Sequence, residues 1–239
     1  MDTYNIIYVG EQALSIEFPN KISPMINQRL QYLAKIIHQE KLTGVQAIIP
    51  AYHTLLVTFN LLKTNFQVLK TKLIPIINNH LKTSLPKNRV LIIPVCYEEP
   101  FNPDLKTIAK YAGITKKEVV KLHSKKKYPI YFLGFLPNFA YMASVDKKIA
   151  MPRLSKPRLK IPAGSVGIAG FQTGFYPVSS PGGWRLIGRT PLTLYNPKSP
   201  EPFYHAGDEI KFQAITKNEF KSIQQDEHEK SYKVRIIKE

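Results

Sequence analysis

The first part of the chain alternates between strand-like and helix-like runs of apolar residues. Residues 4–9 and 13–18 are short apolar runs, separated as the two strands of a hairpin are. Ser23 then offers an N-cap and Pro24 a first-turn proline, after which apolar side chains recur at the spacing of one helix face. The pattern predicts a hairpin followed by an amphipathic helix.

The same order of elements follows a second time. Residues 45–49 and 54–59 have the composition of strands, and residues 66–81 have the apolar spacing of a helix, which Pro75 is expected to kink or break. Two strand-strand-helix units predict a two-layer α/β domain over residues 1–86. In such a domain both helices cover one face of an antiparallel sheet.

Capping residues predict three shorter helices in the remainder of the chain. Residues 102–105, Asn-Pro-Asp-Leu, have the form of a capped helix start, and this helix is expected to reach Gly113. Thr115 and Thr216 are each followed three residues later by a glutamate, which is the spacing of a capping box.

Short strands dominate the rest of this second part. Residues 89–95 and 232–237 have strand-like composition, and residues 128–215 hold short β-like runs broken by many glycines and prolines. This pattern favours a closed or sandwich-like β-domain. The predicted fold class is therefore α+β, with a β-domain over residues 87–239 that carries a C-terminal helix and strand.

The charge of the chain is strongly basic. Its 239 residues include 34 basic and 17 acidic side chains, a net charge of +17. Such an excess attracts phosphates, whether in nucleic acids, nucleotides or membrane surfaces. The lysines are dispersed, however, and no nucleic-acid-binding motif accompanies them. DNA binding is therefore expected to be weak and indifferent to sequence, with no specific nucleic-acid partner.

Targeting and redox features point to the cytoplasm. No apolar run approaches the ~20 residues that span a bilayer, and the start of the chain lacks the basic residues and cleavage site of a secretory signal. Cys96 is the only cysteine, so no internal disulfide can form. The chain is expected to be cytoplasmic and to have no membrane partner.

Familiar signatures of catalysis are missing. The chain has no GxxxxGK[ST] phosphate loop, no HExxH or CxxC pair and no GxSxG nucleophile elbow. Its six histidines are scattered, so no metal site is predicted. Any active site must be built from less stereotyped parts.

Two arginines with the same local sequence are candidates for such a site. Arg153 and Arg158 each follow a proline. Proline stiffens the backbone beside each guanidinium, which helps to hold a bidentate donor toward a carboxylate or phosphate. The alternative is two surface arginines among many basic residues. The repetition of the geometry favours the binding role.

The segment from Ser180 to Trp184 places Gly182 and Gly183 beside the only tryptophan. Glycines permit positive φ and let backbone N–H groups approach an anion or a carbonyl. The indole of Trp184 offers an apolar wall for a small ring. A tight turn with a core tryptophan explains the same residues equally well.

Polar side chains in apolar surroundings are further candidates. Gln172, Thr173 and Tyr176 suit the orientation of a substrate amide, although a buried structural network would look the same. His123 lies near the end of a predicted helix, where it suits a general base or a phosphate-binding cation. A histidine at a helix end is also simply well placed against the helix dipole.

Three aromatic residues in the same region, Phe135, Phe139 and Tyr141, are expected to belong to the core rather than to a pocket. The single cysteine, Cys96, is likewise interpreted as a small buried hydrophobe.

Five blocks of sequence carry a resemblance to a known family. They are IPVCYEE (93–99), GFLPNFAYM (134–142), MPRLSKPR (151–158), IPAGSVGIAGFQTGFYP (161–177) and SPGGWRLIGRTP (180–191). In these blocks the chain resembles the family of the 5-oxoprolinase B subunits, also known through kinase A inhibitor and allophanate hydrolase subunit 1 domains. The resemblance runs from Tyr4 to the tail. Asn138 stands where the family usually has glycine, and because asparagine tolerates left-handed backbone, the turn is expected to survive.

The resemblance implies a fold and an activity. The fold is an N-terminal α/β domain followed by a cyclophilin-like β-barrel. The activity is an ATP-dependent cyclic amide hydrolysis, in which 5-oxo-L-proline is opened to L-glutamate. The implied partners are the C subunit of 5-oxoprolinase and a LamB/YcsF-type A subunit. Magnesium-bound ATP would serve the complex, while this chain alone is expected to be inactive and to bind no cofactor tightly.

Within that framework the site residues take specific roles. Arg153, Arg158 and the turn before Trp184 are expected to surround one pocket on the barrel. The catalytic residues are expected to be His123, Arg153 and Arg158, and the substrate-binding residues Gln172, Thr173, Tyr176, Ser180, Gly182, Gly183 and Trp184.

Three other functions remain open at this point. The first is a regulatory protein that inhibits a sensor histidine kinase by binding it. The second is a component of an allophanate hydrolase. The third is a basic nucleic-acid-binding protein, for which the charge is the sole support.

Overall fold

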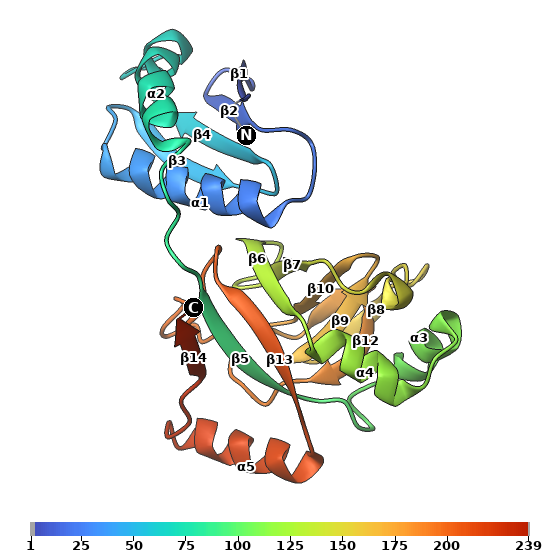
Figure 1. Ribbon diagram of the computed structural model, residues 1–239. Coiled ribbons are helices and arrows are strands. Elements are labelled where there is room, and N and C mark those ends of the chain that lie inside the picture. Colours follow the sequence, from blue (N-terminus) through green and yellow to red (C-terminus); the bar gives the residue numbers. More distant parts are fainter. Residues whose placement is uncertain (1–2, 239) are drawn as a thin grey trace. The chain divides into compact units, whose positions relative to one another are not determined.

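The computed structural model describes residues 3–238, which form two compact units that join in sequence at Lys87 and Asn88 (Figure 1). In the first unit the strands form one antiparallel sheet with the order β1-β2-β4-β3. Its elements are β1 (Asn5–Tyr8), β2 (Ala13–Glu17), α1 (Pro24–Gln39), β3 (Val45–Pro50), β4 (Thr54–Phe59) and α2 (Phe66–His80).

The core of this unit lies between the sheet and its two helices. Alternate side chains of the central strands β2 and β4 point into the same cluster as the apolar faces of α1 and α2, which confirms the two-layer prediction. Full burial of each such side chain stabilises the fold by roughly 1.5–3 kcal/mol. The fully buried members are Leu14, Ile16, Leu30, Leu33, Leu55, Val57, Phe59, Leu69, Leu73 and Ile77.

Both helices of this unit begin where the sequence indicates. At the start of α1, the Ser23 side chain accepts a hydrogen bond from the Ile26 backbone N–H at 3.4 Å. Helix α2 continues through Pro75 to His80, so the break considered for Pro75 does not occur. Leu73 and Ile77, on either side of the proline, are fully buried, and their packing offsets the backbone hydrogen bond that proline removes.

A buried arginine joins the two helices. Arg29 of α1 is only 8% exposed, and its Nη1 donates to the carbonyl oxygens of His80 at 2.7 Å and Thr83 at 2.8 Å. His80 is the last residue of α2 and Thr83 lies three residues beyond it, and carbonyls at a helix end lack partners within the helix. Burial lowers the pKa of the Arg29 guanidinium. The cation therefore caps a helix end that would otherwise bury unpaired acceptors.

Replacement of Arg29 by methionine should destabilise this unit. The change leaves two carbonyls without their donor, so we expect the free energy of unfolding in urea to fall by about 1.5–3 kcal/mol. Lys35→Met, at an exposed position of the same helix, is the matched control and should change it by less than about 0.5 kcal/mol. Equal losses in the two variants would contradict the capping role.

The second unit is built mainly from short strands. It also carries a single 3-10 turn, η1 (Lys147–Ile149), before the two strands β8 and β11 that pair only with each other. Its other elements are β5 (Arg89–Cys96), α3 (Leu105–Ala112), α4 (Lys116–Ser124), β6 (Lys127–Leu133), β7 (Ala140–Ala143), β8 (Arg158–Ile161), β9 (Ser165–Ala169), β10 (Gln172–Phe175), β11 (Ser180–Gly182), β12 (Arg185–Arg189), β13 (Glu209–Ile215), α5 (Lys217–His228) and β14 (Arg235–Lys238).

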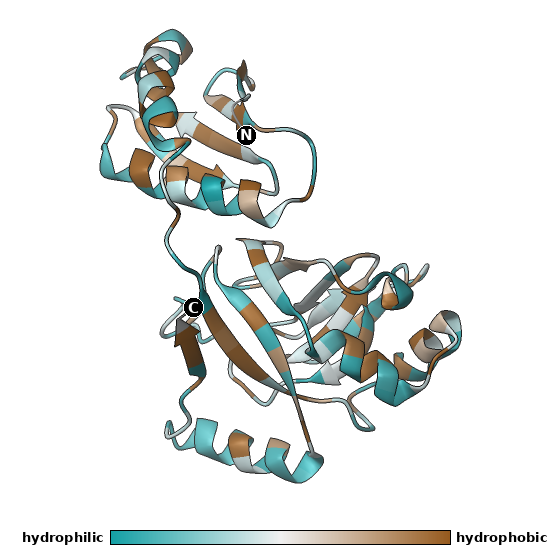
Figure 2. Ribbon diagram, in the orientation of Figure 1, coloured by the Kyte–Doolittle hydropathy of each residue, from teal (hydrophilic) through white to brown (hydrophobic). Residues whose placement is uncertain are grey.

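Seven of these strands close into a barrel, which confirms the predicted α+β fold with a barrel domain. The order is β12-β9-β10-β7-β6-β13-β5, and pairing of Arg189 with Cys96 joins β12 to β5. Strand β5 runs parallel to β13 and is apolar along most of its length (Figure 2). Helix α5 packs through Phe220 against Cys96 and Ile215, so Cys96 is buried as expected.

The helix starts of this unit show where local sequence rules hold and where they fail. The capping boxes at Thr115 and Thr216 are both formed. Asp104 occupies the N-cap position of α3, but its side chain makes no capping hydrogen bond. Its carboxylate makes a tertiary contact with Arg158 instead. The last strand begins at Arg235, three residues later than the expected 232–237 strand.

Candidate functional site

A pocket of about 340 Å³ on the barrel domain, called the aromatic pocket here, collects several predicted site residues. It lies beside the β8–β11 ribbon, and Arg153 is its single charged lining residue. Arg153 is exposed, and it pairs with no carboxylate among residues 3–238. Its guanidinium is therefore available to an anionic ligand. The lining residues are Phe135, Phe139, Tyr141, Arg153, Pro157, Tyr176, Pro181, Gly182, Gly183 and Trp184.

The walls of the aromatic pocket are braced by edge-to-face aromatic contacts. The Trp184 ring lies 5.3 Å from Phe139, 6.4 Å from Tyr141 and 6.5 Å from Tyr176, measured between centroids. Such geometries are favourable for aromatic pairs and fix the rings against one another. The pocket thus offers rigid apolar faces to a small planar ring.

Tyr176 supplies a neutral hydroxyl to this wall. Its side chain is 1% exposed, and burial raises its pKa to about 12, although a hydrogen bond with the Trp184 backbone acts in the opposite direction. The phenol therefore stays protonated at physiological pH. It is able to donate or accept a hydrogen bond there.

Gly182 is required by close packing rather than by an unusual backbone. Neither Gly182 nor Gly183 has positive φ, so the predicted use of positive φ at these glycines is wrong. A Cβ at Gly182 would lie 2.6 Å from the Tyr176 hydroxyl oxygen and 2.7 Å from Ile161 Cδ1. Both neighbours are buried, so neither is free to move aside.

Alanine at Gly182 should therefore overpack the pocket wall. We expect Gly182→Ala to lower the free energy of unfolding by about 1–3 kcal/mol, as forced shifts in a packed core do. Gly183→Ala is the matched control, because a Cβ there meets no heavy atom closer than 3.6 Å. Chemical denaturation of both variants tests this, and equal stability of the two would contradict it.

Arg158 does not join Arg153 in the aromatic pocket, which corrects the expectation of one shared pocket. Pro157 lines the aromatic pocket, but Arg158, the first residue of β8, does not. Its Nη2 donates to Asp104 Oδ1 at 2.8 Å, and its Nη1 donates to the Trp184 carbonyl at 3.4 Å. Arg158 is thus an ion-paired residue that supports the ribbon beside the pocket.

His123 lies in the barrel interior and is fully buried. The Thr173 hydroxyl donates to the Gly167 carbonyl at 3.0 Å, so His123 Nε2 carries a hydrogen and donates to Thr173 Oγ1 at 2.8 Å. Nδ1 then accepts from the Tyr97 hydroxyl at 2.8 Å. Burial lowers the pKa of His123 to about 3. With both nitrogens engaged and no charge, His123 is not available as a general base or a phosphate-binding cation, and its geometry supports a structural role.

The predicted substrate-binding residues fall into two groups, those that line the aromatic pocket and those that do not. Thr173 belongs to the buried network just described, and Ser180 is buried with its hydroxyl donating to the Pro181 carbonyl at 3.2 Å. Gln172 is half-buried at the start of β10 and does not line the aromatic pocket. Four of the seven predicted substrate-binding residues do line it, namely Tyr176, Gly182, Gly183 and Trp184.

The sequence interpretation missed three lining residues. Phe135, Phe139 and Tyr141 were expected to be core, yet all three line the aromatic pocket. Phe139 is also buried, whereas Phe135 is 68% exposed with a φ of 66°. The sequence signal that could have indicated this surface is the group of aromatic residues next to Gly134 and Pro137, because glycine and proline mark a loop and loops lie on the surface.

Comparison with known proteins connects this chain to a family. The model of the carboxyltransferase domain, subdomain C and D, matches residues 4–205. The chain is 36% identical over 228 residues to the 5-oxoprolinase B subunit of Bacillus subtilis, which covers 91% of this chain and 95% of that protein. The chain belongs to the family of 5-oxoprolinase B subunits. The B subunit of Haemophilus influenzae is 34% identical over 209 residues, covering 87% and 96%.

Solved structures share the fold of this 5-oxoprolinase B-subunit family member. The protein TTHA0988 is 32% identical with a TM-score of 0.73 over 86% of this chain, which spans 40% of that longer protein. A conserved uncharacterized protein of Pyrococcus horikoshii is 43% identical with a TM-score of 0.53, covering 90% of this chain and all of that one. The urea amidolyase of Kluyveromyces lactis, at 18% identity and a TM-score of 0.79, shows the fold alone.

The turn at Asn138, which was expected to survive with asparagine in place of glycine, is formed. The φ of Asn138 is 62°, the left-handed conformation that was expected. Its side-chain amide donates to the carbonyls of Leu194 at 3.2 Å and Pro200 at 3.0 Å, and its own carbonyl accepts from the Tyr204 hydroxyl at 2.6 Å. The asparagine side chain thus fixes the turn that precedes Phe139.

Two features are absent from residues 3–238. Within them, no group of three or more histidine, cysteine, aspartate or glutamate side chains is arranged to hold a metal ion. Over the same residues, no helix combines the length and the apolar character needed to cross a membrane.

Proposed function

We propose that the chain works as the B subunit of an ATP-dependent 5-oxoprolinase and that its aromatic pocket holds the lactam ring of 5-oxo-L-proline. The observation that carries the proposal is the pairing of rigid aromatic walls with one unpaired arginine, Arg153, in a pocket of about 340 Å³. Relatives covering most of the chain are named as 5-oxoprolinase B subunits. That naming does not favour the kinase-inhibitor and allophanate hydrolase alternatives.

The pocket matches the substrate group by group. 5-Oxo-L-proline is a five-membered lactam that carries one carboxylate. The planar guanidinium of Arg153 suits bidentate binding of that carboxylate at the exposed rim. The rings of Phe139 and Trp184 suit the apolar face of the lactam. The Tyr176 hydroxyl, neutral at physiological pH, suits a hydrogen bond with a lactam N–H or C=O.

The chemistry explains why such a ligand needs ATP. A lactam carbon is poorly electrophilic because nitrogen donates into the carbonyl. Transfer of the γ-phosphoryl group to the lactam oxygen expels ADP, and water then adds to the activated carbon. Cleavage of the ring C–N bond gives an acyl phosphate, and a second water releases phosphate and L-glutamate. The role proposed for this chain is to bind and orient the ring for those steps.

The assembly proposed for this reaction contains two further proteins, the C subunit and a LamB/YcsF-type A subunit, with magnesium-bound ATP as the co-substrate. The absence of a GxxxxGK[ST] loop from the sequence supports dependence on these partners for nucleotide chemistry.

The isolated chain should form no glutamate from ATP and 5-oxoproline, while the three purified proteins together should do so. The measurement is glutamate release by each of the three proteins alone, by each pair and by the complete mixture. Turnover by this chain alone would contradict its dependence on partners. Full activity of the mixture without this chain would contradict the proposed function.

A further inference from the structure

A second pocket, of about 300 Å³ and called the cationic pocket here, lies on the barrel domain beside the aromatic pocket. Three basic side chains line it, Arg158, Lys160 and Arg189, together with the hydroxyl-bearing Ser165. Asp104 pairs with Arg158 at 2.8 Å, which leaves Lys160 and Arg189 as cations that no carboxylate within residues 3–238 compensates.

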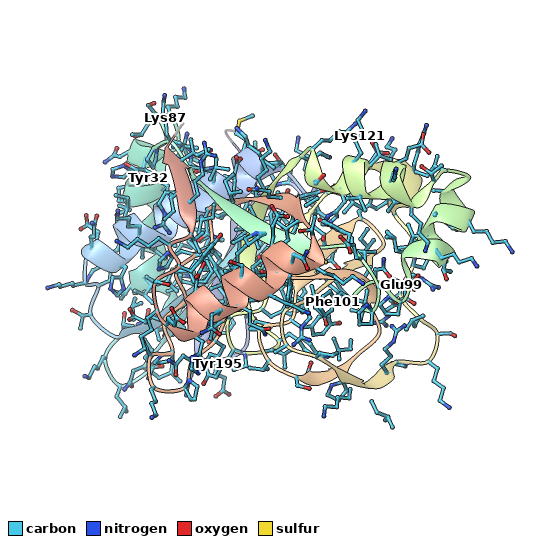
Figure 3. The ribbon with its side chains drawn as sticks, turned by 90° about the horizontal axis from the view of Figure 1, so that it is seen from below. Tyr32, Lys87, Glu99, Phe101, Lys121 and Tyr195 are labelled. Carbon is cyan, nitrogen blue, oxygen red and sulfur yellow. The ribbon has the colours of Figure 1, made fainter. Side chains whose placement is uncertain are left out.

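Arg189 is held in place as a ligand-binding arginine would be. It is half-buried in β12, its Nε donates to the Ala163 carbonyl at 2.8 Å, and its guanidinium carbon lies 5.9 Å from the centre of the Phe101 ring. Phe101, labelled in Figure 3, is fixed in turn by stacking on Phe220 of α5, with the ring centroids 4.6 Å apart. With Nε engaged, the terminal amino groups of the guanidinium remain to bind a ligand.

Of these two cations, Arg189 is half-buried, and partial removal of a cation from water without a partner is unfavourable unless a ligand compensates it. Ser165 lines the same pocket and is only 4% exposed, and its hydroxyl makes no hydrogen bond within residues 3–238. The nearby carboxylate of Glu99 lies outside the pocket and pairs with Lys116 at 3.3 Å. The pocket therefore combines the fixed guanidinium of Arg189, the exposed ammonium of Lys160 and the hydroxyl of Ser165.

We propose that the cationic pocket binds a phosphoryl group. Two uncompensated cations match the charge of a phosphate dianion, and its tetrahedral oxygens accept from the guanidinium, the ammonium and the hydroxyl together. A monocarboxylate would leave one cation without a partner. The phosphoryl group belongs either to a nucleotide or to a free phosphate or phosphorylated small molecule.

The two pockets share one structural element. Pro157 lines the aromatic pocket, and Arg158, the next residue, lines the cationic pocket and donates to the carbonyl of Trp184. A phosphoryl group in one pocket would thus lie across the β8–β11 ribbon from a ring in the other. The phosphate site is argued from the cationic pocket alone, and only its use in lactam activation rests on the proposed function.

The test is calorimetric titration of the full chain with inorganic phosphate, ADP and adenosine, at an ionic strength of about 0.15 M to suppress non-specific attraction. We expect saturable binding of phosphate and ADP and none of adenosine. Tighter binding of ADP than of phosphate would identify a nucleotide as the source, and equal affinity would identify a free phosphoryl group. No saturable binding, or binding of adenosine equal to that of ADP, would overturn the proposal.

Three variants distinguish phosphate binding in the cationic pocket from non-specific attraction by the positive charge of the chain. Arg189→Gln should weaken phosphate binding by about tenfold or more, since it removes a charge-assisted donor pair, and Lys160→Gln by about threefold. Lys156→Gln, an exposed lysine of the preceding loop, is the matched control and should bind like the unaltered chain. Lys160 is also exposed, so its variant remains informative if Arg189→Gln does not fold. Equal weakening in all three variants would show non-specific attraction and contradict the site.

The phosphate site and the proposed function fail in different ways. If the complete assembly forms glutamate but this chain binds neither phosphate nor ADP, the phosphate site is contradicted and the proposed function is not. Specific phosphate binding by a chain that is dispensable for glutamate formation would do the reverse.

Discussion

Arg153→Lys should lower kcat/KM for 5-oxo-L-proline in the reconstituted assembly by about ten- to hundredfold, as the loss of a bidentate contact to a charged group would. The lysine keeps the charge but loses the planar fork that matches a carboxylate. Since Arg153 is exposed at the rim of the aromatic pocket and has no carboxylate partner within residues 3–238, unfolding stability should hardly change. Steady-state kinetics and a denaturation curve measure the two effects separately.

The matched control for Arg153 is Arg235→Lys, another exposed arginine, on the last strand of the same domain and outside the aromatic pocket. It should leave both kinetics and stability unchanged. Full activity of Arg153→Lys, or a loss of activity explained by unfolding, would place the substrate carboxylate elsewhere.

Asp104→Ala should cause the largest loss of stability, about 2–4 kcal/mol in the free energy of unfolding. The Asp104 carboxylate is 8% exposed, accepts from Arg158 at 2.8 Å and accepts from the buried Leu186 N–H at 2.6 Å. Alanine leaves a backbone donor unpaired and Arg158 without its partner. Urea denaturation measures the loss.

Two further variants separate these contributions. Asp104→Asn keeps an acceptor for Leu186 N–H and removes only the charge, so its loss should be clearly smaller. A double-mutant cycle with Arg158→Met should show positive coupling, because the second change removes the unpaired cation. A loss below about 1 kcal/mol in Asp104→Ala, or additive effects in the cycle, would contradict the structural role of this pair.

The elements that local sequence decides were predictable. The capping boxes at Thr115 and Thr216 form because both partners lie within one helical turn. The apolar spacing of residues 24–39 predicted α1, because that spacing is likewise a local property of the sequence. Closure of the barrel depended on pairings between distant strands, such as Arg189 with Cys96, and the sequence pattern indicated only the class of β-domain.

The site was predicted less completely, because its geometry depends on tertiary contacts. Local rules expected a capped helix start at residues 102–105, yet the Asp104 carboxylate binds Arg158, which is 54 residues away. The Met-Pro-Arg and Lys-Pro-Arg repeats look alike, but the second arginine pairs with Asp104 and lines another pocket. His123 could not be separated from a catalytic base until its partners, Tyr97 and Thr173, were known.

The central claim is that the aromatic pocket holds the lactam, and the single tryptophan of the chain reports on it directly. Trp184 is the only tryptophan among the 239 residues and forms part of the pocket wall. Titration of the purified chain with 5-oxo-L-proline should produce a saturable change in the fluorescence of Trp184. L-Proline, which lacks the lactam carbonyl, should not produce this change. Arg153→Lys should shift the midpoint to higher concentration by about tenfold or more. A fluorescence signal that does not respond to 5-oxo-L-proline, or one that responds equally in Arg153→Lys, would contradict the account.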